Sequence, residues 1–397
     1  MSIFEKLQPQ PEDPILSLPL YYAADPRDVK VNLGVGAYRD AEGKPQVLET
    51  VREAEKMLYD LHGNKEYLPI DGMKEFIKAS QKLVFGENCE ALKQGRVAGV
   101  QTVGGSGALS LGAELANHHL SNGKAYLPNP TWPNHQSLFY HSHLEINWYP
   151  YYDRKNRSLE FDKLLESMKK MSENSVILLH ASCHNPTGTD LTQDQWVEMS
   201  HVVKKNRLIP FFDIAYQGFG EGLESDAASI RYFAEQGHEM LVAVSHSKNF
   251  GLYGERVGHL SVVADSKERA QIVQTNLKKL IRSDYSSPPL HGGGIVKTIL
   301  TSEKLKNEWL QETALMRERV IEMRQALVSS LEEKGANFSF LAGQKGFFSY
   351  LCISPESVQR LRDEYAIYMP PDSRINVAGL TRDRVDYVAE AIIAVSQ

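Results

Sequence analysis

Short apolar runs alternate with amphipathic helical patterns between about residues 95 and 265 of this chain. This alternation predicts strands joined by crossover helices, and therefore a mostly parallel sheet covered by helices on both faces. In such a sheet, ligands bind outside the carboxyl ends of the strands, so the polar residues that follow each run are the candidates for a functional site. The runs that predict buried strands are 125–127, 176–179, 209–212, 240–244 and 260–263.

A further pattern, free of proline, extends from Glu303 to about Glu333 and predicts one long helix. Its apolar residues recur at helical spacing and share one face. We interpret this segment as a helix that bridges two domains, with a coiled coil that binds a partner as the alternative. The residues of the apolar face are Trp309, Met316, Val320, Met323, Leu327 and Leu331.

The two ends of the chain show other patterns. Residues 335–397 mix short strands with a terminal helix and predict a compact α+β unit. The first 30 residues are rich in proline and predict loops, with an exposed apolar stretch at Ile15–Leu16. We therefore expect an N-terminal arm with part of a small domain over 1–40, a large domain over 41–310, and the rest of the small domain over 311–397.

Composition narrows the class of protein. The 397 residues are enough for one large and one smaller domain, and 42% hydrophobic with 24% charged residues is typical of soluble globular proteins. The net charge of -6 argues against a nucleic-acid partner. No apolar run approaches the roughly 20 residues of a membrane span, and acidic residues interrupt the N-terminus where a signal peptide would lie. We expect a cytoplasmic protein without a membrane partner.

The cysteines and histidines do not indicate a metal site. Cys89, Cys183 and Cys352 are widely separated and form neither a CxxC pair nor a metal-ligand spacing. The 13 histidines include no HExxH motif, and no GxSxG motif of a serine hydrolase occurs. We expect no metal ion.

The most informative segment, residues 245–258, follows the strand predicted at 240–244 and reads S-H-S-K-N-F-G-L-Y-G-E-R-V-G. Lys248 lies just past the strand end, among the hydroxyls of Ser245 and Ser247. Such a lysine is partly desolvated and can stay neutral enough to form a Schiff base. Arg256 and the hydroxyls suit a phosphate group.

A glycine-rich segment, Q-T-V-G-G-S-G-A-L at 101–109, precedes a helical pattern. Backbone amides at such a helix N-terminus suit a phosphate. A dinucleotide fingerprint is excluded, because Ser110, and not glycine, stands at the position of its small closing residue. In addition, Lys124 and Ala125 stand about where the ribose-binding acid belongs.

Polar residues also follow the other predicted strands. Trp132 lies between two prolines, which hold it rigidly enough to stack on a planar heterocycle. Asn185 belongs to a tight turn, H-N-P-T-G. Asp213 ends a buried strand, which costs several kcal/mol unless its charge is paired. A helix N-cap is the alternative role for Asp213.

These segments closely resemble those of the fold-type I, pyridoxal-phosphate-dependent aminotransferases of class I, in the aspartate/aromatic branch. The matching segments are S-x-S-K-N-F-G-L-Y-x-E-R-x-G, G-G-S-G-A-L, N-P-T-W-P-N-H, H-N-P-T-G and D-I-A-Y-Q-G-F, and the resemblance extends over nearly the whole chain. It implies an α/β fold, with a large domain built on a mostly parallel seven-stranded sheet flanked by helices and a smaller α+β domain. It also implies pyridoxal 5'-phosphate as the cofactor.

The resemblance implies a role for each residue of these segments. Lys248 would hold the cofactor and move a proton. Asp213 would pair with the ring nitrogen, with His135 behind it. Trp132 would cover the ring, and Tyr216 would hydrogen-bond the phenolic oxygen. The remaining cofactor-binding residues implied are Gly105, Ser106, Asn185, Ser245, Ser247, Arg256 and Tyr67.

For the substrate, Arg374 in S-R-I-N-V-A-G resembles the arginine that binds the α-carboxylate as a bidentate fork. Arg282 resembles the arginine that binds the distal carboxylate of a dicarboxylic substrate. In the family that arginine comes from the other subunit, as does the tyrosine matched by Tyr67. The resemblance therefore implies a homodimer with shared active sites. Gly36, Trp132 and Asn185 are further expected substrate contacts.

The implied reaction passes the amino group of L-aspartate to 2-oxoglutarate in a ping-pong cycle, and aromatic amino acids are the alternative substrates. A lyase or decarboxylase on the same fold is disfavoured by Arg282, and a cofactor-sensing regulator by the lack of a basic DNA-binding segment. Three single positions and one segment depart from the family pattern without removing a catalytic group: Gly254, His259, Ser287 and the segment 370–372.

Overall fold

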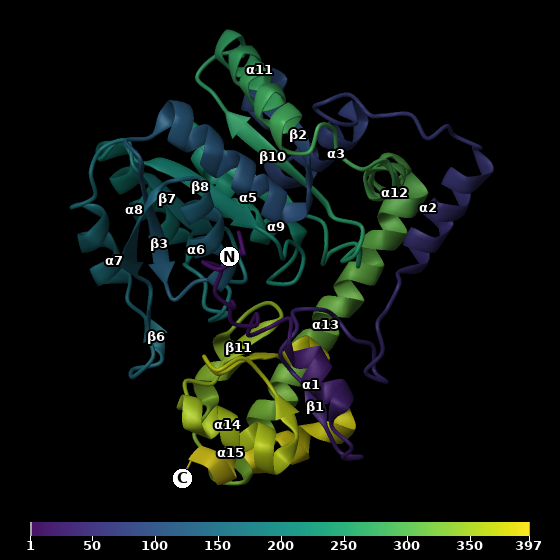
Figure 1. The fold of residues 1–397 in the computed structure, drawn as a ribbon, viewed down its shortest axis with the longest axis vertical. Helices are drawn as coiled ribbons and strands as arrows, with labels where there is room; N and C mark the ends of the chain where they lie inside the picture. The colour runs from purple at the N-terminus through teal and green to yellow at the C-terminus, as the bar shows by residue number, and fades with distance from the viewer. Residues whose placement is uncertain (1, 397) are drawn as a thin grey trace.

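The computed structural model describes residues 2–396 and contains a central seven-stranded sheet in the order β2-β10-β9-β8-β7-β3-β4 (Figure 1). Every neighbouring pair is parallel except those that involve β10, which is antiparallel to both β9 and β2. The predicted α/β class with a mostly parallel sheet is confirmed. The strands of this sheet are β2 (Val97–Val103), β3 (Lys124–Asn129), β4 (Glu145–Pro150), β7 (Val176–His180), β8 (Ile209–Ile214), β9 (Met240–Ser245) and β10 (Val257–Val263).

Helices cover both faces of the sheet, which explains why its inner strands are continuous apolar runs. On one face, Leu178 and Phe211 pack with side chains of α5, α6 and α11. On the other face, Leu179 and Phe212 pack with side chains of α7, α8 and α10. These helices are α5 (Gly104–Leu115), α6 (Pro133–His141), α7 (Phe161–Met168), α8 (Gln193–Lys205), α10 (Ala228–Glu235) and α11 (Lys267–Asp284).

The long helix α13 (Glu303–Glu333) has the bounds that the apolar pattern predicts. It runs from the region of the sheet to the C-terminal part of the chain (Figure 1). Trp309 near its start donates a hydrogen bond to the carbonyl of Asn249, whereas Leu331 near its end is buried in the core shared with α15 (Val385–Ser396). Its apolar face is therefore used within the chain, and the helix is a bridge.

The remaining elements surround these. The further helices are α1 (Leu18–Ala24), α2 (Glu49–Asp60), α3 (Lys74–Phe85), α4 (Glu90–Lys93), α9 (Leu223–Asp226), α12 (Leu290–Thr301) and α14 (Pro355–Tyr365). The shorter helical turns are Ala116–Leu120, Ser339–Gly343, Val377–Gly379 and Arg382–Arg384. The small strands are β1 (Val31–Asn32), β5 (Tyr152–Asp153), β6 (Ser158–Leu159), β11 (Phe348–Tyr350), β12 (Ile367–Tyr368) and β13 (Arg374–Asn376).

The N-terminal segment lies beside the C-terminal unit, because β1 pairs in parallel with β12 (Figure 1). This pairing agrees with an N-terminal contribution to the small domain, although the exact boundaries at residues 40 and 310 stay a prediction. The prediction of loops alone was wrong for α1. Pro19 falls in its first turn, where proline is tolerated because the N–H it lacks would have no helical partner. Of the predicted exposed stretch, Leu16 is exposed, as expected, whereas Ile15 is half-buried.

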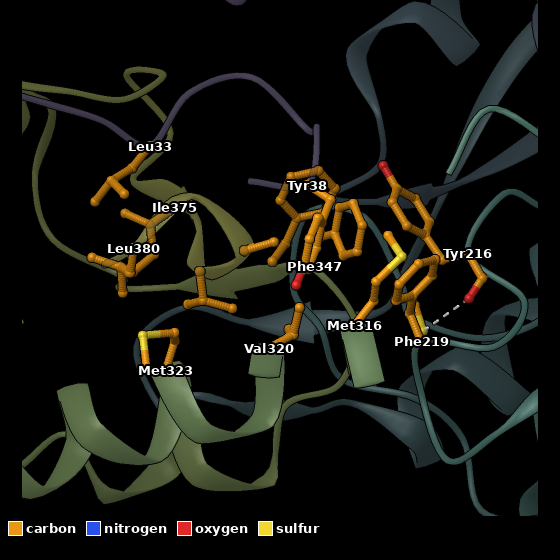
Figure 2. Close-up of a cluster of buried hydrophobic side chains, with 14 of the residues drawn as sticks. Leu33, Tyr38, Tyr216, Phe219, Met316, Val320, Met323, Phe347, Ile375 and Leu380 are labelled. Carbon is orange, nitrogen blue, oxygen red and sulfur yellow. Dashed lines mark hydrogen bonds between the residues drawn. The ribbon is translucent and has the colours of Figure 1, made fainter. Parts of the chain in front are cut away.

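A hydrophobic core joins the C-terminal unit to the sheet. Figure 2 shows Tyr216 and Phe219, which follow β8, packed around Phe347, with Met316 and Val320 of α13 nearby. The loop after β8 is therefore fixed from the side of the small unit. Among residues 2–396, no helix is long and apolar enough to cross a membrane, and no three His, Cys, Asp or Glu side chains gather as a metal site would require.

Candidate active site

Residues from distant parts of the chain meet at one edge of the sheet, where the parallel strands end. Asp213 lies near the end of β8, and Lys248 lies three residues after the end of β9. The antiparallel strand β10 begins at this same edge, because its first residue, Val257, pairs with Val103 at the end of β2. Arg256 therefore lies beside the N-terminus of α5.

Lys248 is the cation at the centre of this edge. Its Nζ lies 5.0 Å from the centroid of the Tyr216 ring. Burial lowers the pKa of Lys248 to about 8; the Asp213 carboxylate opposes this shift, and the Arg256 and Arg374 guanidiniums add to it. A pKa near 8 leaves a usable fraction of neutral amine at neutral pH, as a nucleophile or general base needs.

A chain of hydrogen bonds leads to Asp213. His135 Nε2 lies 2.9 Å from Asp213 Oδ2, and Thr131 Oγ1 lies 2.8 Å from His135 Nδ1 and 3.0 Å from His180 Nε2. The Asn185 N–H donates to His180 Nδ1 at 3.4 Å, so His180 must donate through Nε2. Every donor in the chain then points toward Asp213.

This chain keeps Asp213 ionised. Burial acts to raise the pKa of the Asp213 carboxyl, but the hydrogen bond from His135 and the nearby charge of Lys248 outweigh it, so the pKa lies below its ordinary value. Burial lowers the pKa of His180 to about 3, so its ring is neutral. The second carboxylate oxygen of Asp213, Oδ1, accepts no side-chain hydrogen bond within residues 2–396, and suits the N–H of a protonated ring nitrogen.

The segment before α5 forms a tight cradle with the residues around Lys248. A Cβ on Gly104 would lie 2.5 Å from Nη2 of Arg256, and one on Gly105 would lie 2.8 Å from Cβ of Ser245. Gly104 also has φ +67°, which a larger residue adopts only with strain. Only glycines let the helix start approach Arg256 and Ser245 this closely.

The cradle has the donors that a phosphate monoester needs. The N-terminus of α5 supplies backbone amides, and Ser106 lies in the first turn of this helix. Ser245 and Ser247 supply hydroxyls 3.2 Å apart, and Arg256 supplies the cation. Together with Asp213 and Lys248, these residues fit the phosphate, the ring nitrogen and the aldehyde of pyridoxal phosphate.

A second cation, Arg374 of β13, is buried beside the same edge. Its guanidinium donates to Asn185 Oδ1 at 3.1 Å and to Gly34 O at 2.6 Å, and it lies over the Phe348 ring at 4.1 Å. Its Nε–H has no partner among the described residues. A buried guanidinium with free donors is suited to a carboxylate. Gly36 lies near this arginine, since a Cβ there would lie 2.7 Å from Phe348.

The aromatic residues predicted for the site are also at this edge. Trp132 immediately precedes α6 and is partly exposed, and its ring meets His135 edge-on at 5.1 Å. Tyr216 is buried, and burial raises the pKa of its hydroxyl, which therefore stays protonated and can donate a hydrogen bond. The side-chain nitrogen of Asn185 makes no hydrogen bond within the described residues and can likewise donate.

Two predicted residues stand apart from this cluster. Tyr67 is 91% exposed. Arg282 lies exposed in the last turn of α11, where it donates a hydrogen bond to Ser286. Nothing within residues 2–396 covers either residue, so their place in an active site stays a prediction that requires a second subunit.

Three residues of the site were missed by the sequence reasoning. Thr131 and His180 complete the chain to Asp213, and both follow or end a predicted strand, which was the available signal. Asp190 accepts the backbone N–H groups of Cys183 and His184, each at 2.8 Å, and so fixes the turn that carries Asn185. No sequence signal indicated Asp190.

A surface cavity of about 1320 Å³ lies elsewhere, lined by residues of α3, α4, α10 and α13. None of the predicted site residues lines it. The site is therefore indicated by its chemistry and not by the size of a cavity.

Comparison with known proteins agrees with this geometry. The family described as aminotransferase class I and II matches residues 28–392. The chain is 46% identical over 391 residues to the mitochondrial aspartate aminotransferase of Xenopus tropicalis. The matched region covers 98% of this chain and 92% of the relative.

Two solved structures share the fold over nearly the whole chain. One is the aromatic-amino-acid aminotransferase of Burkholderia pseudomallei, covalently bound to pyridoxal phosphate, with a TM-score of 0.96, 44% identity and 100% coverage of both chains. The other is the psychrophilic aromatic-amino-acid aminotransferase of Psychrobacter sp. B6, cocrystallised with aspartic acid, with a TM-score of 0.97, 43% identity and 99% coverage of both chains.

Proposed function

The chain belongs to the aminotransferases of class I and II, and we propose on this basis that it transfers the amino group of L-aspartate to 2-oxoglutarate, giving oxaloacetate and L-glutamate. It is a transaminase that depends on pyridoxal phosphate. The observation that supports the proposal most strongly is that Lys248, Asp213 and Arg374 meet at one edge of the sheet. This set provides a base, a partner for a ring nitrogen and a clamp for a carboxylate.

The residues of the edge would hold the cofactor at three points. Gly105, Ser106, Ser245, Ser247 and Arg256 would bind the phosphate. When bound, pyridoxal phosphate supplies an electron-withdrawing ring that stabilises negative charge at the substrate Cα and accepts the amino group. Asp213 would keep the proton on the ring nitrogen, and His135 holds the carboxylate in place.

The other side chains act on the ring and on the substrate. Trp132 would cover one face of the ring, and Asn185 and Tyr216 would donate hydrogen bonds to its phenolic oxygen. Lys248 would hold the cofactor through Nζ and, as a free amine, would take the proton from the substrate Cα. Arg374 binds the α-carboxylate and so orients the bond from Cα to that proton toward Lys248.

A second candidate function, transamination of aromatic amino acids, is favoured by the two structural neighbours, which are named aromatic-amino-acid aminotransferases. One of them was cocrystallised with aspartic acid, so aspartate stays a candidate substrate beside the aromatic amino acids. The two functions differ in what faces the distal end of the substrate, which is the position proposed for Arg282.

The experiment that separates the two candidates is a substrate panel. Half-reactions of the holoenzyme with aspartate, glutamate, tyrosine and phenylalanine are followed by the absorbance of the cofactor. A kcat/KM for aspartate at least tenfold above that for tyrosine supports the proposal. A wild type that is far faster with tyrosine moves the function to the second candidate, and no half-reaction with any of the four rejects both.

We further propose a homodimer in which Arg282 and Tyr67 complete the partner's site. The N-terminal segment supports a second subunit, since it carries apolar side chains that no other described part of the chain covers. These residues are Ile3 (89% exposed), Phe4 (65%), Leu7 (72%), Leu16 (70%) and Leu20 (71%). The cytoplasmic location stays a prediction, because the Xenopus tropicalis relative is named mitochondrial.

Subunit mixing tests the shared site. The Lys248→Ala and Arg282→Ala chains should each be nearly inactive with aspartate, but a hybrid dimer would combine an intact Lys248 with the partner chain's intact Arg282 in one of its two sites. Random mixing should therefore restore roughly a quarter of the wild-type activity, since about half of the dimers are hybrids. If Arg282 serves its own chain, the mixture gains nothing over the two variants.

A further inference from the structure

A row of hydrogen-bonded side chains lies behind the turn that carries Lys248. Ser80 of α3 places Oγ 2.5 Å from Nε2 of His246 and 2.8 Å from Nδ1 of His259, which lies on β10. His246 Nδ1 lies 3.3 Å from Oδ1 of Asn249. Ser80, His246 and His259 are fully buried, and Asn249 nearly so. His246 and Asn249 are close neighbours of Lys248 on either side of it.

The geometry fixes where the protons of this row lie. Burial lowers the pKa of His246 to about 4 and the pKa of His259 well below its ordinary value, so each ring is neutral and carries one N–H. His246 Nδ1 faces the acceptor oxygen of Asn249, so it is the donor and Nε2 is the acceptor. Ser80 must then donate to His246 and accept from His259 Nδ1.

The remaining ring nitrogen of the row, Nε2 of His259, agrees with these proton positions. His259 Nε2 has no hydrogen-bond partner within residues 2–396. In the order derived above, it is a bare lone pair, and not an unpaired N–H. The side-chain donors of Ser80, His246 and His259 are all used, and each hydrogen bond is directed toward Asn249. Hydrogen bonds aligned in this way polarise and strengthen one another.

Other contacts hold the same turn. Trp309 Nε1 donates to the backbone oxygen of Asn249 at 2.7 Å, and its ring stacks on Phe250 at 4.5 Å. The N–H of His246 donates to Val257 O at 3.0 Å. The residues on both sides of Lys248 are thus anchored to α3, α13 and β10.

We propose that Ser80, His246 and His259 are positioning residues that set the backbone of Lys248, and through it the approach of Nζ to the substrate Cα. The inference rests on the proposed role of Lys248 as the base. His246 and His259 act as a pair, because one Ser80 hydroxyl hydrogen-bonds one nitrogen of each ring. Ser80 is therefore the link whose loss uncouples the row.

The test removes this link and compares it with the same kind of bond elsewhere. In the holoenzyme, Ser80→Ala should lower kcat on the order of tenfold or more, since a misplacement by about 1 Å can cost on the order of 100-fold. KM should change far less, because no substrate contact is removed. The deuterium isotope effect with Cα-deuterated aspartate should rise, since proton transfer by Lys248 becomes slower relative to the other steps.

A second measurement, made without substrate, tests the same proposal. The visible circular dichroism of the bound cofactor reports how the ring and Lys248 are held, and it should change in Ser80→Ala. This signal does not depend on which amino acid is the substrate, so it tests the positioning role even if the proposed reaction fails. Ser80→Thr keeps the hydroxyl and should restore the signal and the isotope effect.

Ser200→Ala is the matched control. Ser200 Oγ lies 2.7 Å from Nε2 of His238, both residues are buried, and neither belongs to the site. This variant should lose stability without a change in the isotope effect or the cofactor signal. The proposal is overturned if Ser80→Ala behaves like Ser200→Ala, with a lower unfolding midpoint and wild-type kcat, isotope effect and cofactor spectrum. His259→Asn keeps a donor near Nδ1 and His259→Leu removes it, so this pair decides the question if Ser80→Ala does not fold.

Discussion

Replacement of Arg374 by alanine should lower kcat/KM by a similar factor for every amino acid that the enzyme accepts. A guanidinium has five N–H donors. Two of them are used within the protein, by Asn185 Oδ1 at 3.1 Å and by Gly34 O at 2.6 Å. The remaining three include Nε–H, which has no partner among the described residues. Because every amino acid presents an α-carboxylate, the loss of these donors affects all substrates.

The size of the effect follows from the number of bonds. A carboxylate accepts hydrogen bonds from two of the free N–H donors, and each charge-assisted bond contributes about 1.5–3 kcal/mol. Two such bonds amount to about 3–6 kcal/mol, or on the order of 10² to 10⁴ in kcat/KM at about 1.36 kcal/mol per decade. Arg374→Lys keeps the charge but loses the planar fork, so its activity should lie between those of the alanine variant and the wild type.

The assay compares Arg374→Ala with Arg282→Ala in stopped-flow half-reactions with aspartate and with phenylalanine. The Arg282 variant should lose about 2–5 kcal/mol with aspartate, roughly 30-fold to several-thousand-fold, and far less with phenylalanine, which has no distal carboxylate. Equal losses for both substrates in Arg282→Ala would refute its specificity role. A loss below about tenfold in Arg374→Ala, or a loss confined to aspartate, would refute the assignment of the α-carboxylate clamp.

Two further outcomes are expected. Asp213→Ala should lower kcat by several orders of magnitude, because the ring nitrogen loses the partner that keeps it protonated, while the far-UV circular dichroism stays that of the folded protein. Near wild-type turnover would reduce the role of Asp213 to that of a helix N-cap. In the cofactor-free protein, Lys248 has a folded pKa of about 8, below its ordinary value of 10.5, so the folded state binds fewer protons between these pH values. Its unfolding free energy relative to Lys248→Met should therefore rise with pH, by at most about 3 kcal/mol between pH 8 and pH 10.5, and a flat difference in chemical denaturation would contradict the depressed pKa of Lys248.

Local patterns made the elements of the fold predictable. The run 176–179 lies within β7, and the proline-free segment from Glu303 to Glu333 coincides with α13, whose first turn is capped by the Ser302 hydroxyl. Residues close in sequence decide such elements, through burial of one face and satisfaction of the helix end. The helix α1 was missed because proline was read as a loop signal, although it is compatible with a first turn.

Contacts between distant residues were predictable only through the family resemblance, or not at all. Asn185 and Arg374 are 189 positions apart, and their hydrogen bond depends on how the C-terminal unit packs against the sheet. The hydrogen bonds from His180 through Thr131 and His135 to Asp213 also join three separate segments, since only Thr131 and His135 are close in sequence. His259 was visible in the sequence as a departure from the family pattern, but its partner Ser80 lies 179 positions away and could not be inferred.

The direction of one strand decides whether the phosphate cradle can exist. The short apolar run at 260–263 predicts a strand but carries no information on its direction. Since β10 is antiparallel, Arg256 enters it at the edge where β2 and β9 end, and its guanidinium lies beside Gly104. A parallel β10 would place Arg256 at the opposite edge, about 23 Å away for its seven residues. The turn from Ser245 to Arg256 is too short for a crossover, which takes a dozen or more residues and usually a helix, so the strand must turn back. The same short connection therefore keeps Lys248 at the edge and brings the arginine to the start of α5.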